Sequence, residues 1–307
     1  MSAIAVRAHA KINLDLRVLG PRADGFHELR TVFQSIALHD TLVCVPREGP
    51  FAIECGAAGV PLNESNLIWR AAEALWRAAR RRLPMGGVVV QLEKRIPLQS
   101  GLGGGSADAA AALVGLARAW GIPVRPPQLT DVAATLGADV PFFLTGGTAL
   151  GLGRGDETYP LADLPRHWVV LLVPGFGVSS GEAYGWYDAE RDLSRGPIAR
   201  EPQHVPGPWP SRAAQMVNDL EAAVARHHPE IEQMKAALRR AGAAAAAMTG
   251  SGSAVFGLFQ RRREATSAME HLSGSGWRVL LTESVGRGDY ARLSRPRSVR
   301  ARARTLR

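Results

Sequence analysis

The residue types that best predict chemistry lie in one glycine-rich segment, Pro97-Leu98-Gln99-Ser100-Gly101-Leu102-Gly103-Gly104-Gly105-Ser106-Ala107. Its four glycines let backbone N–H groups approach an anion without obstruction from Cβ atoms. An alanine-rich helix is predicted from Ser106 to Trp120, with Ser106 as its cap, and the N-terminus of a helix favours negative charge. The segment therefore predicts a site for the phosphates of a nucleotide, with a plain turn before a helix as the alternative.

Two better known glycine motifs do not describe this segment. The P-loop needs a lysine after its last glycine, and this sequence has none there. A dinucleotide-binding fingerprint needs glycine at position 106, which is serine, and an acidic ribose ligand after the helix is not evident. The loop thus indicates a different class of nucleotide-binding enzyme.

Alternating apolar residues predict strands that position the loop. Residues 4 to 19 alternate in one phase, which places Lys11 and Asn13 together on the opposite face. Residues 29 to 45 read as one or two further strands with a break near 38 to 40. An apolar stripe predicts a helix over 67 to 79, and the apolar run 88 to 92 predicts a buried strand that leads into the loop.

The second half of the chain predicts another mixed layer. A short helix over 129 to 136 ends at Gly137, and Asp139 stands where it can cap the next helix. We expect a domain boundary near residue 160, before the apolar strand 168 to 174. After a polar, proline-rich loop at 190 to 210, the pattern predicts two helices over 218 to 227 and 229 to 241.

The sequence closes with a second glycine turn at 249 to 253, a strand over 254 to 259, and a final helix and strand. The chain has 307 residues, 46% of them hydrophobic, which favours two globular domains. No long apolar run and no signal-peptide pattern occur, so we expect a cytoplasmic protein that makes no membrane contact. Cys44 and Cys55 are too few for a disulfide framework or a metal-ligand pattern.

The net charge of +9 resides mostly at the C-terminus. Residues 286 to 307 hold eight arginines and one aspartate, so the remaining chain carries only +2. With few apolar residues, the segment 287 to 307 is expected to be a disordered basic tail. A solvated tail and a nonspecific contact with RNA or an anionic surface are both open for it, and a nonenzymatic RNA-binding protein is the alternative to an enzyme.

Several separated motifs together resemble one kinase superfamily. They are Ala10-Lys11-Ile12-Asn13-Leu14, Asp24-Gly25-Phe26-His27, the 97 to 110 loop, Gly137-Ala138-Asp139-Val140-Pro141, Asn218-Asp219-Leu220-Glu221 and Met248-Thr249-Gly250-Ser251-Gly252-Ser253. The chain resembles the galactokinase, homoserine, mevalonate and phosphomevalonate (GHMP) kinase superfamily, and within it most closely the 4-diphosphocytidyl-2-C-methyl-D-erythritol kinase family. The resemblance spans residues 7 to about 285.

The resemblance implies an α+β fold of two domains: a ribosomal-protein-like domain over 1–160 that carries the ATP loop, and a ferredoxin-like domain over 161–286. It implies ATP-dependent phosphorylation of the C2 hydroxyl of 4-diphosphocytidyl-2-C-methyl-D-erythritol, giving the 2-phosphate and ADP in non-mevalonate isoprenoid biosynthesis. The expected partner is this small cytidine-diphosphate substrate, with no specific nucleic acid. We expect a monomer or a weak homodimer.

The resemblance also implies roles for particular residues. Asp139 would accept the proton of the acceptor hydroxyl, and Lys11 would orient the Asp139 carboxylate. The structural alternatives are a helix cap for Asp139 and a solvated strand residue for Lys11. The cofactors are ATP, held by residues 97 to 107, and Mg²⁺ with unknown ligands; Asp108 is expected to contact this ion or to favour the helix start. The expected substrate-binding residues are Asn13, Phe26, His27, Tyr184, Gly250, Ser251 and Gly252.

Overall fold

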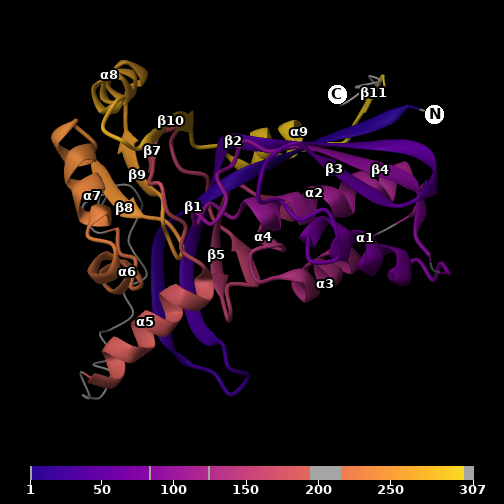
Figure 1. Cartoon of the computed structure of the whole chain (residues 1–307), viewed down its shortest axis with the longest axis horizontal. Coiled ribbons are helices and arrows are strands. Elements are labelled where there is room, and N and C mark those ends of the chain that lie inside the picture. Colours follow the sequence, from indigo (N-terminus) through magenta and orange to yellow (C-terminus); the bar gives the residue numbers. More distant parts are fainter. Residues whose placement is uncertain (1, 83, 124, 194–215, 301–307) are drawn as a thin grey trace.

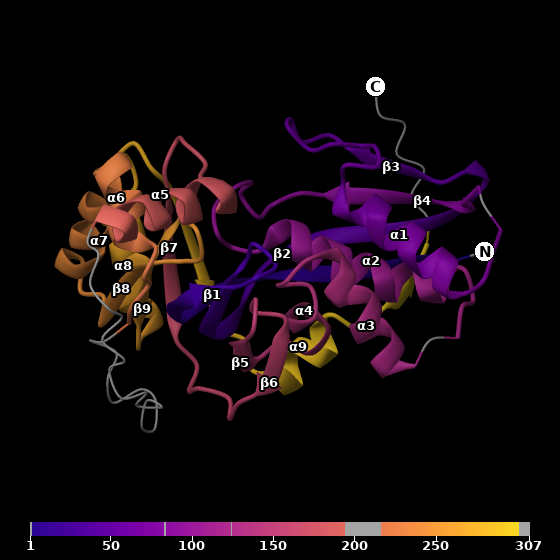
Figure 2. The same cartoon turned by 90° about the horizontal axis from the view of Figure 1, so that it is seen from below.

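The computed structural model describes residues 2–82, 84–123, 125–193 and 216–300. It consists of two layered α+β units side by side, as Figures 1 and 2 show. The two-domain α+β fold predicted from the sequence is confirmed. None of the described helices is long and apolar enough to cross a membrane.

The first sheet is built on a long antiparallel pair, β1 (Ala3–Pro21) and β2 (His27–Pro50). Next to β2 lies β4 (Gly86–Glu93), which runs parallel to the outer strand β3 (Ala52–Cys55). The other members are β5 (Thr148–Leu152), β6 (Glu157–Pro160) and β11 (Arg297–Val299). Strand β2 is continuous, but it bulges beside the expected break: His9 pairs with His39 and Lys11 with Ser35, so residues 36–38 of β2 have no partner on β1.

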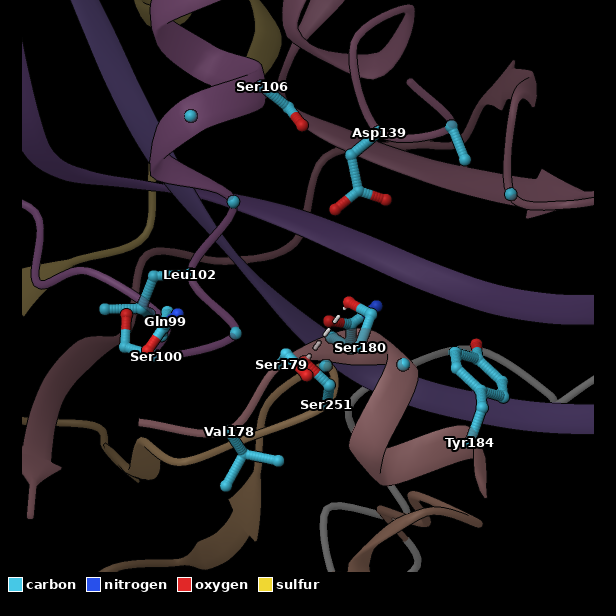
Figure 3. A pocket seen from close by; sticks show the side chains of 18 of the residues that line it. Gln99, Ser100, Leu102, Ser106, Asp139, Val178, Ser179, Ser180, Tyr184 and Ser251 are labelled. Carbon is cyan, nitrogen blue, oxygen red and sulfur yellow. Dashed lines mark hydrogen bonds between the residues drawn. The ribbon is translucent and has the colours of Figure 1, made fainter. Parts of the chain in front are cut away.

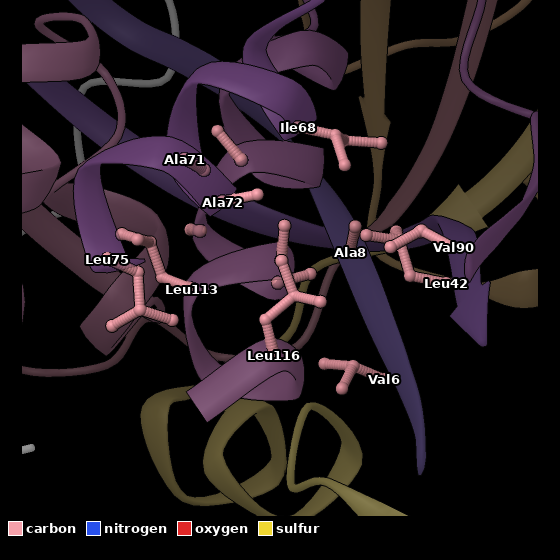
Figure 4. Close-up of a cluster of buried hydrophobic side chains, with 14 of the residues drawn as sticks. Val6, Ala8, Leu42, Ile68, Ala71, Ala72, Leu75, Val90, Leu113 and Leu116 are labelled. Atoms are coloured by element: carbon pink, nitrogen blue, oxygen red, sulfur yellow. The ribbon is translucent and has the colours of Figure 1, made fainter. Parts of the chain in front are cut away.

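Helices α1 (Leu67–Ala78), α2 (Gly104–Ala119), α3 (Pro126–Leu136) and α4 (Phe142–Thr145) complete this unit. The Asn66 side chain caps α1 by accepting a hydrogen bond from the backbone N–H of Ile68. Side chains from α1, α2 and the sheet form the core in Figure 4. A Cβ on Gly115 would lie 3.1 Å from both Cys44 and Val6, so this glycine lets α2 pack close to the sheet.

The second sheet has the order β10-β7-β9-β8, with all pairs antiparallel. Its strands are β7 (Trp168–Val173), β8 (Ala245–Met248), β9 (Val255–Phe259) and β10 (Arg278–Glu283). Helices α6 (Glu221–His227), α7 (Glu230–Arg240) and α8 (Arg262–Leu272) belong to this layer, and α5 (Ser180–Leu193) leads away from it (Figure 1).

Three predictions about helix ends and the tail were wrong. The cap of α2 is Gly103 and not Ser106, because Gly103 adopts the left-handed conformation (φ +70°) and starts the helix earlier. Asp139 does not cap α4, whose first flanking residue is Pro141. The expected disordered tail is ordered as far as residue 300: α9 (Arg287–Leu293) buries Tyr290, and β11 pairs with β1.

The tail is ordered because it fits against the first domain. The Tyr290 hydroxyl donates to the Phe143 carbonyl at 2.6 Å, and a Cβ on Gly146 would lie 2.2 Å from the tyrosine ring. The composition of the segment is polar, but these few contacts hold it. Residues 301–307 and most of the 190 to 210 loop lie outside the described residues. The domain division near residue 160 stays a prediction, with residues 287–300 returning to the first sheet.

Candidate active site

A cleft of about 1310 Å³ lies between the two units. The cleft is lined by residues from β1, the glycine loop, the segment before α4, helix α5 and the second glycine turn. Figure 3 shows part of this lining, including Ser106, Asp139, Tyr184 and Ser251. Among the residues predicted for the site, the structure brings these together in the lining: Lys11, Asn13, Phe26, His27, residues 97 to 106, Asp139, Tyr184, Gly250 and Ser251. Ala107 and Gly252 are buried instead, beneath the helix start and inside the second turn.

The two glycine turns pack directly against each other. A Cβ on Gly101 would lie 2.0 Å from the Thr249 carbonyl oxygen, so only glycine fits at this position. The Ala254 N–H donates to the Ser100 carbonyl at 3.1 Å, which joins the turns by a backbone hydrogen bond. This close approach brings a loop of the first domain and a turn of the second to one end of the cleft.

The glycines of the loop serve different purposes. Gly103 has a positive φ, and its Cβ would lie 2.7 Å from the Phe143 ring, so backbone and packing alone require glycine there. Gly105 is exposed in the first turn of α2, and the nearest side-chain atom, of Leu67, would lie 3.6 Å from a Cβ. Packing therefore does not explain Gly105, and backbone access for an anion stays the predicted reason for a glycine there.

Lys11 and Asp139 face each other at the cleft. The Lys11 Nζ lies 3.5 Å from Asp139 Oδ2 and donates to Asn13 Oδ1 at 2.6 Å. Only 4% of the Lys11 side chain is exposed, against 30% for Asp139. A buried ammonium thus pairs with a carboxylate that the cleft can reach. This geometry suits an ion pair that accepts a proton from a bound hydroxyl and stabilises the negative charge that develops.

Both the side-chain amide and the backbone N–H of Asn13 form hydrogen bonds within the protein. Its Nδ2 donates to Thr31 Oγ1 at 2.7 Å, and its backbone N–H donates to Thr249 Oγ1 at 3.0 Å. Because Asn13 Oδ1 also accepts from Lys11, the amide fixes the direction of the lysine. Asn13 therefore supports Lys11 in this structure, and its contact with substrate stays a prediction.

An aromatic group stands away from the glycine turns. The His27 ring stacks on Tyr184 with centroids 4.7 Å apart, and His27 Nε2 hydrogen-bonds Asp188 Oδ1 at 2.8 Å. Phe26 is 54% exposed, and the Arg154 guanidinium lies 5.0 Å from its ring centroid. Burial raises the pKa of Tyr184, and the nearby carboxylate of Asp139 raises it further, so Tyr184 stays a neutral phenol. These groups are suited to a planar, polar ligand.

Sequence reasoning missed a buried ion cluster behind the loop. Lys94 lines the cleft, and its Nζ donates to Asp40 Oδ2 at 2.5 Å and to Asp108 Oδ2 at 2.6 Å. Desolvation raises the pKa of Asp108 to about 8, opposed by the charge of Lys94. Asp108 lies beyond the first turn of α2, and its Oδ2 is engaged by Lys94. No short-range pattern signals this cluster, because its three members meet only in the tertiary structure.

Comparison with known proteins agrees with this geometry. The model of the GHMP kinases N terminal domain matches residues 66–147, and the model of the GHMP kinases C terminal domain matches residues 209–277. A 4-diphosphocytidyl-2-C-methyl-D-erythritol kinase of Solibacter usitatus is 45% identical over 87% of this chain and 84% of its own length. The kinase of the same name from Moorella thermoacetica is 42% identical over 84% of this chain and 90% of its own length.

The chain belongs to the 4-diphosphocytidyl-2-C-methyl-D-erythritol kinase family. A crystal structure titled 4-(cytidine 5'-diphospho)-2C-methyl-D-erythritol kinase matches it with a TM-score of 0.73 at 35% identity, covering 92% of this chain and 99% of the other. A homoserine kinase of Cytophaga hutchinsonii is only 18% identical but has a TM-score of 0.68 over 97% and 98% of the two chains, which shows the shared fold alone. The predicted membership of the GHMP superfamily is confirmed.

The kinase family and its fold were thus predicted correctly, whereas three polar residues of the cleft were not among the predicted site residues. Asp188, Arg154 and Lys94 line the cleft and were absent from the predicted set. Asp188 lies on α5, a helix that the apolar pattern did not reveal. Its charge gains meaning only through its contact with His27, which is distant in sequence.

Proposed function

We propose that this chain transfers the γ-phosphoryl group of ATP to the C2 hydroxyl of 4-diphosphocytidyl-2-C-methyl-D-erythritol. The products are the 2-phosphate and ADP, in the non-mevalonate route to isoprenoid precursors. The observation that carries this proposal is the identity of 45% and 42% over most of the chain with kinases named for that substrate. The Lys11–Asp139 pair beside a glycine loop supplies the chemistry that such a reaction requires.

The glycine loop is proposed to hold the phosphates of ATP. Gly104 and Gly105 begin α2, so backbone N–H groups of its first turn lack partners within the helix and are available to an anion. The helix dipole favours negative charge at the same place. The second turn, with Gly250 and Ser251 in the lining, adds backbone donors from the other domain.

Asp139 is proposed as the general base and Lys11 as its orienting cation. Phosphoryl transfer needs the acceptor oxygen in line with the γ-phosphorus and charge stabilisation around the transferred group. Asp139 accepts the proton of the acceptor hydroxyl as that oxygen attacks, while the buried ammonium of Lys11 holds the carboxylate in place. The partly exposed Asp139 and the buried Lys11 match these two tasks.

The aromatic group is proposed to receive the cytosine base. Phe26 presents an exposed ring that a base can stack against, and His27 offers polar ring atoms beside it. Tyr184 already stacks on His27, so we assign it the support of the histidine and not the first contact with the base. The diphosphate and methylerythritol then extend toward Asp139.

Mg²⁺ is proposed as the counter-ion of the triphosphate. The Ser106 hydroxyl lines the cleft beside the loop, as Figure 3 shows, and an oxygen donor of this kind suits Mg²⁺. When bound, the ion neutralises charge on the phosphate oxygens. Asp108 is engaged by Lys94 and is not assigned to the metal.

The test is ADP release from ATP and Mg²⁺ with 4-diphosphocytidyl-2-C-methyl-D-erythritol, beside mevalonate, homoserine and galactose as control acceptors. Turnover with the first acceptor alone is the expected result. Turnover with another acceptor would retain the superfamily and overturn the proposed cytidine site. No turnover with any acceptor would contradict the proposed reaction.

A further inference from the structure

A second groove, of about 420 Å³, lies where the two sheets meet and shares no residue with the catalytic cleft. Both domains contribute to it: its main lining residues are Leu38, Arg95, Arg166, Trp168, Arg262 and Leu281. We call it the arginine groove. Its volume falls within the range of about 300–1,000 Å³ typical of small-molecule sites.

Three arginines bring positive charge to the arginine groove from three distant parts of the chain. Arg95 pairs with Glu93 at 2.7 Å, and Arg166 pairs with Glu283. Among the residues that the structure describes, no carboxylate pairs with Arg262. These exposed pairs are weak, and Glu283 is the single acidic residue in the lining, so the groove keeps an excess of positive charge.

Two of the three guanidinium groups lie against one indole ring. Arg166 lies 5.0 Å and Arg262 5.2 Å from the centroid of the Trp168 ring. Contacts of this kind orient a guanidinium while leaving its N–H donors available, because the attraction to the ring is through its face. Arg166 donates through Nε and Nη2 to Glu283, so its Nη1 group and the guanidinium of Arg262 are the donors left for phosphate oxygens.

The remaining lining is apolar. Leu38 comes from β2 and Leu281 from β10, and Trp168 adds its ring. The Leu38 N–H donates to Thr282 Oγ1 at 2.9 Å, which ties the two strands together at the groove. A ligand that fills the groove therefore needs an apolar part as well as an anionic one.

We propose that the arginine groove binds a phosphate monoester or diphosphate that carries a small apolar group. The phosphate oxygens accept hydrogen bonds from Arg166 and Arg262, and the apolar group lies against Leu38 and Leu281. An occupant touches both domains at once. This site is separate from the proposed kinase reaction and does not depend on it.

The test is a calorimetric titration of the full chain with phenyl phosphate, compared with inorganic phosphate. Phenyl phosphate is expected to bind more tightly, because only it fills the apolar side. Arg262→Gln is expected to weaken phenyl phosphate binding by at least about ten-fold, since a charge-assisted contact is lost. Arg263→Gln is the matched control: Arg263 is exposed on the same turn of α8 but does not line the groove.

The KM for ATP separates this site from the catalytic cleft. It is expected to be the same in Arg262→Gln as in the wild type, because Arg262 lies outside the cleft lining. Binding of phenyl phosphate that Arg262→Gln leaves unchanged would overturn the proposal, since the ligand would then sit elsewhere. The absence of binding, or equal binding of inorganic phosphate, would overturn it as well.

Discussion

The Lys11 Nζ lies 3.5 Å from Asp139 Oδ2, although the two residues come from the first strand and from the segment before α4. The lysine is buried and its ammonium is held by Asn13, so the carboxylate meets a fixed cation at the wall of an open cleft. If Asp139 capped α4, its oxygens would accept hydrogen bonds from backbone N–H groups, but α4 has no side-chain cap. The carboxylate is therefore available for chemistry.

Asp139→Asn is expected to lower kcat by at least about 100-fold, because the amide cannot accept the proton of the acceptor hydroxyl. The KM for ATP should change little. Steady-state kinetics with the cytidine substrate measure both, and a thermal melt checks folding. Asp131→Asn, at an exposed position on α3, is the matched control and should behave as wild type. Turnover of Asp139→Asn near the wild-type rate would remove Asp139 from the mechanism.

Lys11→Met removes the ammonium and keeps an unbranched side chain of similar length. If Lys11 acts through Asp139, the double variant Lys11→Met/Asp139→Asn should be about as slow as the slower single variant, because residues that act as one unit are not additive. Multiplied effects in the double variant would show that the two residues act separately.

Gly105→Ala tests the phosphate loop without disturbing its packing. Gly105 has no close neighbour and no positive φ, so alanine there should raise helix stability slightly while its methyl group obstructs the phosphates. We expect the KM for ATP to rise by at least about ten-fold, the cost of losing one charge-assisted hydrogen bond. A substitution of Gly103 would not test the loop, because the strain of a side chain at its positive φ and against Phe143 would by itself explain a loss of ATP affinity.

Gly288→Ala is the control for this variant. Gly288 occupies the second position of α9, as Gly105 does in α2, and a Cβ there meets open space. It should leave the KM for ATP unchanged. An equally unchanged KM in Gly105→Ala would contradict the assignment of the loop.

His27→Gln is expected to raise the KM for the cytidine substrate by about ten-fold, because the hydrogen bond that the imidazole is proposed to make with the cytosine base is lost. The KM for ATP should stay constant, since His27 lies away from the glycine loop. His271→Gln, on the exposed face of α8, is the control. Loss of ATP affinity in His27→Gln would show instead that the histidine supports the whole cleft.

His9 predicts a loss of stability in acid. Burial, with smaller contributions from the nearby His39 and Arg7, lowers the pKa of His9 from its ordinary 6.5 to about 4. Below pH 6.5 His9 binds a proton in the unfolded chain but stays neutral in the folded chain. The free energy of unfolding therefore falls as the pH drops toward 4. At pH 5 the loss from this site is about 2 kcal/mol.

Urea unfolding of wild type and His9→Asn at pH 8 and pH 5 measures this effect. Asparagine keeps a donor near the place of Nδ1, which bonds the Ile36 carbonyl at 3.2 Å, but it does not titrate. From pH 8 to pH 5, the free energy of unfolding should fall by about 2 kcal/mol less in the variant than in the wild type. Equal losses in the two proteins would show that His9 does not titrate in this way.

The sequence by itself determined the features that depend on local spacing. The alternation of residues 4 to 19 fixes β1 and sets Lys11 beside Asn13, and the stripe of 67 to 79 fixes α1. The glycine-rich segment also marks the loop, since its residue types restrict what backbone can form there. These patterns are properties of one strand, one helix or one turn.

Only the tertiary structure decided which of these parts meet. The Gly101–Thr249 contact, the Lys94 cluster and the His27–Asp188 pair join residues far apart in the chain, so no local pattern encodes them. The same reason explains the C-terminal segment: its composition resembles a disordered tail, yet Tyr290 finds a hydrogen-bond partner and a glycine-lined surface on the first domain. Burial against a distant surface outweighs local composition, and that surface exists only after the chain has folded.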